Sequence, residues 1–216
     1  MAQSRPTFGY WPIRAGPRGN VNRYILGYAG VDFEDHRFTK EEWDSSKNNL
    51  GLDFPNLPHI IDGDFKLSES KAVTVYICDR WAPDLMGSTP EERATVIMIQ
   101  QVAIDAFMAG AGSAFSNPDK EVLFEKIAAA LGPLATYLGD KSFLHGNSVR
   151  MTDFILWELI ETGNAAAGDD RLGQQYPKLK AFHERVLALP TFAAYWNSDK
   201  ALKAPFFPPA FAKVQM

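Results

Sequence analysis

The chain has 216 residues, 46% of them hydrophobic and 22% charged, and a formal net charge of −4 at pH 7. This composition is typical of a globular protein, and without a basic excess nucleic acid is a poor candidate partner. A single cysteine, Cys78, excludes an internal disulfide and any paired-cysteine zinc or redox motif. The chain begins without an apolar leader and contains no run of about 18 uninterrupted apolar residues, so we expect a cytoplasmic protein that does not bind or span a membrane.

The first 80 residues alternate between strand and helix patterns. Helical apolar spacing covers residues 21–28 and 70–80. The runs typical of strands are residues 7–13, 32–38, 59–61 and 65–67. The last two runs flank Asp62-Gly63-Asp64, a sequence that favours a tight hairpin turn. The order predicts strand, helix and strand, followed by a hairpin and a helix.

The pattern changes after residue 81. Residues 82–88 form a connector that contains proline and glycine, and Thr89-Pro90-Glu91-Glu92 then has the capping-box spacing of a helix start. All later patterns are helical, over residues 91–114, 121–138, 152–164 and 177–189. We therefore predict an α/β domain over residues 1–81, a linker over 82–88 and an all-α domain over 89–216.

The sequence lacks the usual motifs of metal sites, nucleotide-binding sites and serine hydrolases. The histidines have no metal-ligand spacing, so we expect no metal site. Gly16-Pro17-Arg18-Gly19 matches neither the dinucleotide nor the nucleoside-triphosphate fingerprint, and no GxSxG hydrolase motif occurs. Cys78 falls within an apolar helical stretch, which favours a core residue over a nucleophile.

Three segments carry a more specific signal: GYWPIR at residues 9–14, LGLDFPNLP at 50–58 and SESKAV at 68–73. With them the chain resembles the cytosolic glutathione transferases, and the mu class in particular. The resemblance implies a thioredoxin-like N-terminal domain, an all-α C-terminal domain and a homodimer. It also implies that Pro58 follows a cis peptide bond, that reduced glutathione is the co-substrate and that no cofactor is tightly bound.

The resemblance makes Tyr10 the catalytic residue. Its phenol, with a pKa near 10, is a good donor at neutral pH, and a hydrogen bond to the glutathione thiolate favours the charged form. Ionising a thiol of pKa about 8.5 at pH 7 needs a shift of roughly two units, or about 2.7 kcal/mol. From the residues alone, the alternative is a strand tyrosine that only packs in the core.

The resemblance also implies a glutathione site. Trp43 and Lys47 would hold the glycine end, the Leu57 backbone would pair with the cysteinyl unit, and Ser70 at a helix start would receive the γ-glutamyl carboxylate. Glu69 would meet the γ-glutamyl amine, together with Asp105 from the partner subunit. The full expected set is Tyr10, Trp11, Trp43, Lys47, Asn56, Leu57, Pro58, Glu69, Ser70 and Asp105.

A hydrophobic electrophile would lie between the two domains. Besides Tyr10, the resemblance assigns this pocket to Ile13, Met108, Ala111, Phe115 and Phe207. It assigns Phe54 to the dimer interface, where this exposed loop side chain would insert into the partner.

The sequence departs from the mu pattern at three places. The loop over residues 15–22 is about two residues longer, Glu69 replaces the usual glutamine, and Phe115 or Ser116 stands where some members have a tyrosine. The missing tyrosine and the altered loop keep open a non-catalytic ligand carrier or structural protein of the same fold. A glutathione-dependent isomerase or peroxidase is a further alternative, because the same thiolate can attack other centres.

Overall fold

The N-terminal region of the computed structural model, which describes residues 5–216, is built on one four-stranded sheet. The strands are β1 (Thr7–Tyr10), β2 (Glu34–Arg37), β3 (His59–Asp62) and β4 (Phe65–Ser68), in the order β2-β1-β3-β4. β1 runs parallel to β2 and antiparallel to β3, which forms the predicted hairpin with β4. The predicted sequence of strands and helices along the chain and the hairpin are confirmed, but β1 ends at Tyr10, since Pro12 has no N–H to continue a ladder.

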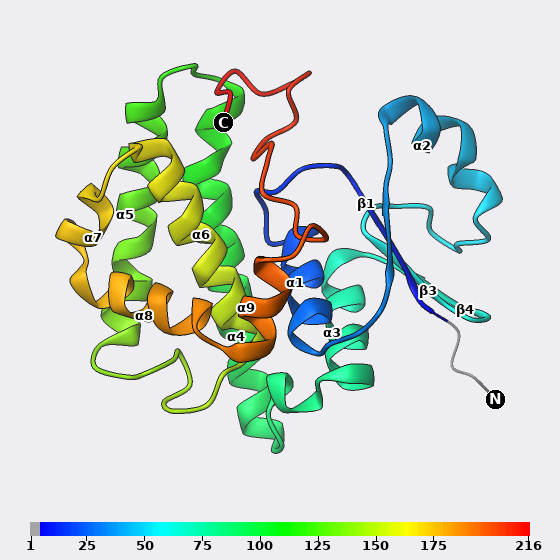
Figure 1. The fold of residues 1–216 in the computed structure, drawn as a ribbon, viewed down its shortest axis with the longest axis horizontal. Coiled ribbons are helices and arrows are strands. Elements are labelled where there is room, and N and C mark those ends of the chain that lie inside the picture. The colour runs from blue at the N-terminus through cyan, green and yellow to red at the C-terminus, as the bar shows by residue number, and fades with distance from the viewer. Residues whose placement is uncertain (1–4) are drawn as a thin grey trace.

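Three helices accompany the sheet: α1 (Asn20–Tyr28), α2 (Lys40–Ser46) and α3 (Ser70–Trp81). In Figure 1, α1 and α3 lie between the sheet and the helices that follow, and α2 lies on the far side of the sheet. The sequence patterns did not predict α2. Its start is nevertheless marked by a capping residue, because the Thr39 hydroxyl accepts the Glu42 N–H at 3.2 Å.

The C-terminal region is helical. Its helices are α4 (Pro90–Ala111), α5 (Lys120–Leu138), α6 (Met151–Ala167), α7 (Arg171–Gln175), α8 (Pro177–Leu187) and α9 (Pro190–Trp196). The four long predicted helices are confirmed, whereas α7 and α9 were missed. Pro190, directly after the last predicted helix over residues 177–189, occupies the first turn of α9, where its missing N–H costs nothing. An α/β region followed by an all-α region is the predicted fold class.

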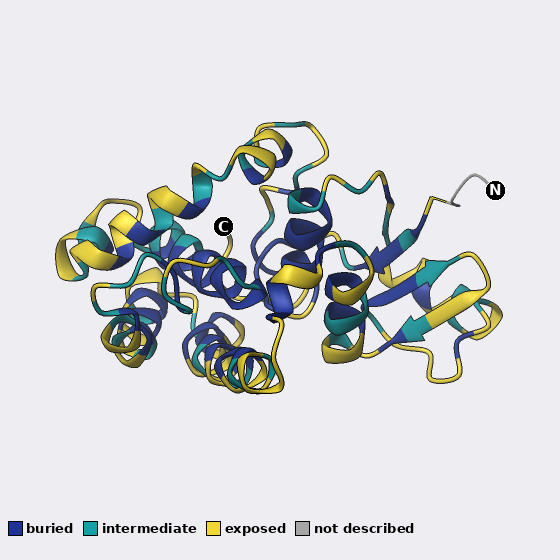
Figure 2. Ribbon diagram, turned by 90° about the horizontal axis from the view of Figure 1, so that it is seen from below, coloured by how far each residue is buried: buried dark blue, intermediate teal, exposed yellow. Residues whose placement is uncertain are grey.

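The two regions share one core. Helix α6 is buried along most of its length, and the buried residues in Figure 2 continue from it into α1 and the sheet. The fully buried ring of Tyr24 on α1 packs edge-to-face on Trp157 of α6 and Phe192 of α9. Cys78 is also buried in this core, as predicted. The core therefore fixes the position of α1, and with it the loop that joins β1 to α1.

Helix α4 combines buried and exposed apolar residues. Residues 90–115 are long and apolar enough to cross a membrane by length and composition alone. In the fold this segment packs against α5 and α6 through buried residues such as Ile99 and Phe107. Ile97, Met98 and Val102 remain exposed on its surface. Helix α4 is therefore a core helix of which one apolar face is not covered by the rest of the chain.

Candidate active site

Tyr10 is the last residue of β1, and its side chain is only 8% exposed. Its carbonyl accepts the Phe38 N–H at 2.9 Å, which holds the strand end against the segment after β2. Within residues 5–216 the Tyr10 hydroxyl has no hydrogen-bond partner. Burial raises the pKa of the phenol, partly opposed by the positive charges of Arg23 and Arg18. The group is therefore a protonated donor at neutral pH.

The longer loop between β1 and α1 covers the Tyr10 ring. A Cβ atom at Gly19 would lie 2.0 Å from two ring carbons of Tyr10, a distance that no side chain can occupy. Glycine is thus required at residue 19 for the loop to approach the ring this closely. Gly19 belongs to the segment, residues 15–22, in which the sequence led us to expect a longer loop, and it packs against the proposed catalytic side chain.

Arg23 holds the chain that leaves Tyr10. Its buried guanidinium donates to the carbonyls of Trp11 at 3.1 Å and Ile13 at 3.4 Å. The same group forms an ion pair with Asp35 at 2.8 Å, so the charge is compensated. The path of residues 11–13 is therefore set by a side chain of α1.

Arg14 fixes the next part of the loop. Its N–H donates to the Pro205 carbonyl at 2.7 Å, and the Ala15 N–H donates to the Phe206 carbonyl at 2.7 Å. Its side chain is buried, lies over the Trp196 and Phe206 rings, and points toward α6. The loop, the C-terminal segment and the helical region meet at this residue.

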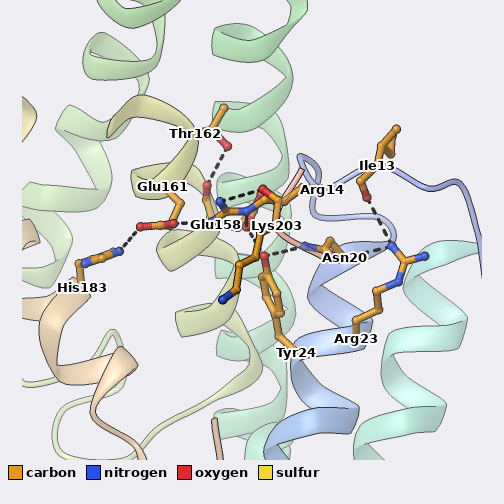
Figure 3. Close-up of polar contacts among 10 residues, drawn as sticks. All are labelled: Ile13, Arg14, Asn20, Arg23, Tyr24, Glu158, Glu161, Thr162, His183 and Lys203. Carbon is orange, nitrogen blue, oxygen red and sulfur yellow. Dashed lines mark hydrogen bonds and ion pairs between the residues drawn. The ribbon is translucent and has the colours of Figure 1, made fainter. Parts of the chain in front are cut away.

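A buried polar network surrounds the Arg14 guanidinium (Figure 3). Arg14 forms ion pairs with Glu158, at 3.6 Å, and with Glu161. The Tyr24 hydroxyl donates to Glu158 at 2.5 Å, and His183 contacts Glu161 at 2.6 Å. Sequence analysis missed this network, because the isolated acidic residues of α6 gave no signal that they would face an arginine almost 150 positions away.

A cavity of about 650 Å³, here called the α3–α4 cavity, opens beside the loop. Its lining residues are Arg18, Asn56, Leu57, Glu69, Ser70, Lys71, Ala72, Gln101, Ile104, Asp105 and Met108. The structure thus brings together four of the expected glutathione-binding residues, Asn56, Leu57, Glu69 and Ser70, and Met108, which was expected to line the electrophile pocket. Asp105 of the same chain also lines this cavity, whereas the resemblance implied an Asp105 from the partner subunit. Arg18 joins them from the inserted loop.

Most polar groups of the α3–α4 cavity are already paired with one another. The Asn56 amide donates to Glu69 at 2.7 Å, and its oxygen accepts the Leu57 N–H at 2.9 Å. The Gln101 amide donates to Asp105 at 2.6 Å and accepts from Lys71. Any ligand that pairs with the Leu57 N–H must therefore displace the Asn56 side chain.

Backbone groups on either side of the β3–β4 hairpin line the α3–α4 cavity, at Leu57 before β3 and at Glu69 and Ser70 after β4. The Leu57–Pro58 peptide bond is cis, as the resemblance implied, and Pro58 is buried at the start of β3. Glu69 has a φ of 74°, in a region that residues other than glycine rarely adopt. It is followed by Ser70, the first residue of a 12-residue helix, where backbone N–H groups are unpaired and favour an anion.

A second cavity, of about 710 Å³, lies between α2 and the C-terminal segment and is here called the α2–tail cavity. Its lining residues are Trp11, Pro12, Ile13, Phe38, Thr39, Lys40, Glu41, Trp43, Asp44 and residues 208–211. Trp11, Trp43 and Ile13 are the expected site residues that meet here. Trp43 is positioned by aromatic packing, edge-on to Trp11 and stacked on His59.

The remaining expected residues are not gathered in either cavity. Lys47 is paired with Asp44 at 3.5 Å. Ala111 and Phe207 are buried in the core, and Phe115 packs edge-on against Phe207 while half of its surface is exposed. Of the expected electrophile pocket, Ile13 thus lines one cavity and Met108 the other.

Phe54 is the most exposed large apolar side chain of the described residues, at 76%. It lies on the loop before β3, where its carbonyl accepts a hydrogen bond from the Ser68 hydroxyl. The loop backbone is thus tied to the sheet while the aromatic ring extends into solvent. Such a protrusion is typical of an interface residue.

Comparison with known families assigns both regions. Residues 6–79 match the family described as "Glutathione S-transferase, N-terminal domain", and residues 104–199 match "Glutathione S-transferase, C-terminal domain". Among proteins of similar sequence, a glutathione S-transferase class-mu 26 kDa isozyme from Fasciola hepatica is 36% identical over 203 residues. The match covers 91% of this chain and 90% of that protein. Glutathione S-transferase Mu 4 of Mus musculus is 30% identical over 213 residues, which cover 93% and 94% of the two chains.

Solved structures show the same fold. The Pi-class glutathione S-transferase of Onchocerca volvulus aligns with a TM-score of 0.81 at 21% identity, over 95% of this chain and 98% of that one. The glutathione S-transferase Blo t 8 aligns with a TM-score of 0.82 at 24% identity, over 97% and 100% of the two chains. The likeness extends through both the sheet and the helical bundle.

Proposed function

The chain belongs to the mu-class glutathione S-transferases, and from this premise we propose that it adds the thiolate of reduced glutathione to hydrophobic electrophiles. The observation that carries the proposal is the α3–α4 cavity, where charged residues from three separate segments, Arg18, Glu69 with Lys71, and Asp105, come together. Tyr10 itself lines neither cavity, and its ring packs against Gly19, the residue after Arg18. Glutathione has two carboxylates, one amine and one thiol, and this set of groups matches them.

Glutathione would enter with its γ-glutamyl end in the α3–α4 cavity. The Ser70 hydroxyl and the free N–H groups at the start of α3 suit the α-carboxylate. Glu69, which lines this cavity, suits the amine, and Asp105 of the same chain lies on the opposite wall. The resemblance implies that a second Asp105, from the partner subunit, would also approach the amine. The cysteinyl unit would pair with the Leu57 backbone once the Asn56 amide moves away from it.

The thiol would then lie at Tyr10 and the glycine end toward Trp11 and Trp43. The protonated Tyr10 phenol donates a hydrogen bond to the sulfur and favours its anionic form. Trp11 and Trp43 line the α2–tail cavity, and we expect the glycine end of the tripeptide to extend into it. The electrophile would be held close to the thiolate, and proximity and thiolate activation together would provide the rate.

A homodimer is part of this proposal. The exposed Phe54 and the uncovered apolar side chains of α4, Ile97, Met98 and Val102, need a covering surface that one chain does not supply. A partner that covers α4 would also bring its own Asp105 near the site. The cytoplasm remains the predicted location, because a reducing compartment keeps glutathione as a thiol.

Turnover with a panel of electrophiles tests the function. We expect glutathione conjugates from the wild type, and a loss of about 100-fold in kcat/KM for Tyr10→Phe, which corresponds to about 2.7 kcal/mol. Tyr137→Phe, at a half-exposed position on α5, is the matched control and should retain full activity. Tight binding of apolar ligands without turnover by the wild type would instead identify a carrier.

A further inference from the structure

His59, the first residue of β3, lies where three parts of the candidate site meet. It directly follows the cis Leu57–Pro58 peptide bond, and Leu57 lines the α3–α4 cavity. In the sheet His59 pairs with Gly9, the residue before Tyr10. Its buried side chain stacks on Trp43, which lines the α2–tail cavity. Neither the sequence patterns nor the family resemblance assigned this histidine to the site.

The His59 ring lies directly on the backbone of β1. A Cβ atom at Gly9 would be 2.2 Å from Cε1 and 2.4 Å from Nε2 of His59, so only glycine lets the ring approach the strand this closely. Phe38 packs edge-on against the same ring, with 5.6 Å between the centroids. The strand is held in place by its own ladders to β2 and β3. The imidazole therefore has a fixed support one residue away from Tyr10.

Helix α2 is attached to the sheet through Trp43. Of the seven residues of α2, all of which the structure describes, only Trp43 is buried. The helix lies on the other side of the sheet from α1 and α3 (Figure 1). A contact between His36 of β2 and Glu42, at 2.7 Å, is exposed and is the weaker attachment. The position of α2, and of the cavity wall that it forms, thus depends on the groups that support Trp43.

His59 provides the stacked support of the indole. The Trp43 and His59 rings are nearly parallel, at 20°, with 6.1 Å between their centroids, whereas Trp11 and Phe38 contact Trp43 edge-on. Burial lowers the pKa of His59 to about 4, and its buried Nδ1 has no hydrogen-bond partner among residues 5–216. At neutral pH the ring is therefore uncharged, and a flat, uncharged ring suits an aromatic contact that is removed from water.

We propose that His59 is a positioning residue for glutathione, which by stacking on Trp43 holds α2 where it receives the glycine end of the tripeptide. This inference rests on the proposed function, in which the glycine end lies toward Trp11 and Trp43. His59 would raise the affinity for the complete tripeptide. It would leave the binding of the γ-glutamyl and cysteinyl units unchanged, and also the chemical step at the thiolate.

Calorimetric titration with glutathione and with γ-glutamylcysteine, which lacks the glycine, tests the proposal. We expect His59→Asn to weaken glutathione binding about tenfold but γ-glutamylcysteine binding less than twofold, because the dipeptide has no group that meets Trp43. His59→Phe keeps a flat ring and should restore most of the glutathione affinity. Ile60→Val, at the next residue of β3 but on the other face of the sheet, controls for lost stability and should bind both ligands as the wild type does.

Kinetics give a second readout, which a general loss of stability would not reproduce. In His59→Asn the KM for glutathione should rise about tenfold, while kcat at saturating glutathione stays within twofold of wild type, because the lost contact is the same in the ground state and the transition state. His59→Gln fills more of the space of the ring and replaces His59→Asn in both measurements if the latter does not fold. Its KM should rise about threefold.

The outcomes separate this inference from the proposed function. Equal losses of affinity for the two ligands in His59→Asn, no loss for either, or no recovery in His59→Phe would overturn the role of His59. A wild type that binds the two ligands equally would also reject it, because the glycine end would then not be recognised. All of these results leave the proposed function standing if the wild type forms glutathione conjugates. A wild type that binds neither ligand rejects both.

Discussion

Two groups of charged residues lie on either side of the β1–α1 loop, and they differ in how they are satisfied. Behind the loop, Arg14, Tyr24, Glu158, Glu161 and His183 are mostly buried and paired with one another (Figure 3). In front of it, the charged residues of the α3–α4 cavity are exposed, and Glu69, Lys71 and Asp105 each have a single hydrogen bond to an uncharged neighbour.

The difference follows from the cost of removing charges from water. A buried charge is tolerated only when it is paired, so the network behind the loop has few other arrangements available to it and acts as a fixed support. An exposed charge can exchange its neighbour for a ligand at little cost. The same residue types therefore build the scaffold on one side of Tyr10 and the binding surface on the other.

The largest expected effect is on stability, at Arg14. Arg14→Met leaves Glu158 and Glu161 without their cation in a buried site, and should lower the free energy of unfolding by about 3–5 kcal/mol. Denaturant unfolding measures this loss. Lys178→Met, which breaks an exposed pair with Asp140, is the control and should cost less than about 1 kcal/mol. Similar losses in the two variants would show that the two kinds of charge do not differ.

His59 is a third case, a buried ionisable group whose Nδ1 atom has no partner. Burial beneath the Trp43 and Phe38 rings lowers its pKa from about 6.5 to about 4. The unfolded chain therefore takes up the proton first as the pH falls, so stability that is present above pH 6.5 is lost toward pH 4. From pH 7 to pH 5 the loss from this group is about 2 kcal/mol.

His59→Asn removes this titration, and comparing the two proteins isolates it. Wild type should lose about 2 kcal/mol more than the variant when denaturant unfolding is repeated at pH 7 and pH 5. His145, whose pKa is also lowered to about 4, contributes equally to both proteins and cancels. Parallel pH profiles for the two proteins would mean that His59 does not resist protonation in the folded state.

The smallest effect on stability is expected in the binding cavity. Ser70→Ala removes a hydroxyl that starts α3, and should change the free energy of unfolding by less than about 0.5 kcal/mol. Glutathione affinity should nevertheless fall about tenfold, because a hydrogen bond to the carboxylate is lost. Calorimetric titration measures this, with exposed Ser148→Ala as the control. Unchanged affinity in Ser70→Ala would remove Ser70 from the site.

The sequence predicted most of the fold because its signals were local. The capping box at Thr89, the Asp62-Gly63 turn and helical apolar spacing each depend on residues within a few positions of one another. A similar local signal, Thr39 followed by Glu42, was present for α2 and was overlooked. Helix α7 has only five residues and offers too short a pattern to detect.

The candidate site was less predictable because long-range packing decides it. Ala111 and Phe207 were expected in a pocket, but the C-terminal segment folds back and its Lys213 and Val214 N–H groups bond the Ala114 carbonyl, which closes this region. Arg14 and Arg18 were visible in the sequence, but their partners lie on other elements. The family resemblance predicted Asn56, Leu57, Glu69 and Ser70 of the α3–α4 cavity, whereas Arg18, which no pattern assigned to the site, reaches it from the loop between β1 and α1.

The pKa of the glutathione thiol bound to wild type and to Tyr10→Phe tests the central claim most directly, after calorimetry has shown that both proteins bind glutathione. We predict a wild-type value about two units below the 8.5 of a free thiol, and a return toward 8.5 in Tyr10→Phe. Values near 8.5 in both proteins, with binding intact, would contradict the assignment of Tyr10 as the residue that activates the thiol.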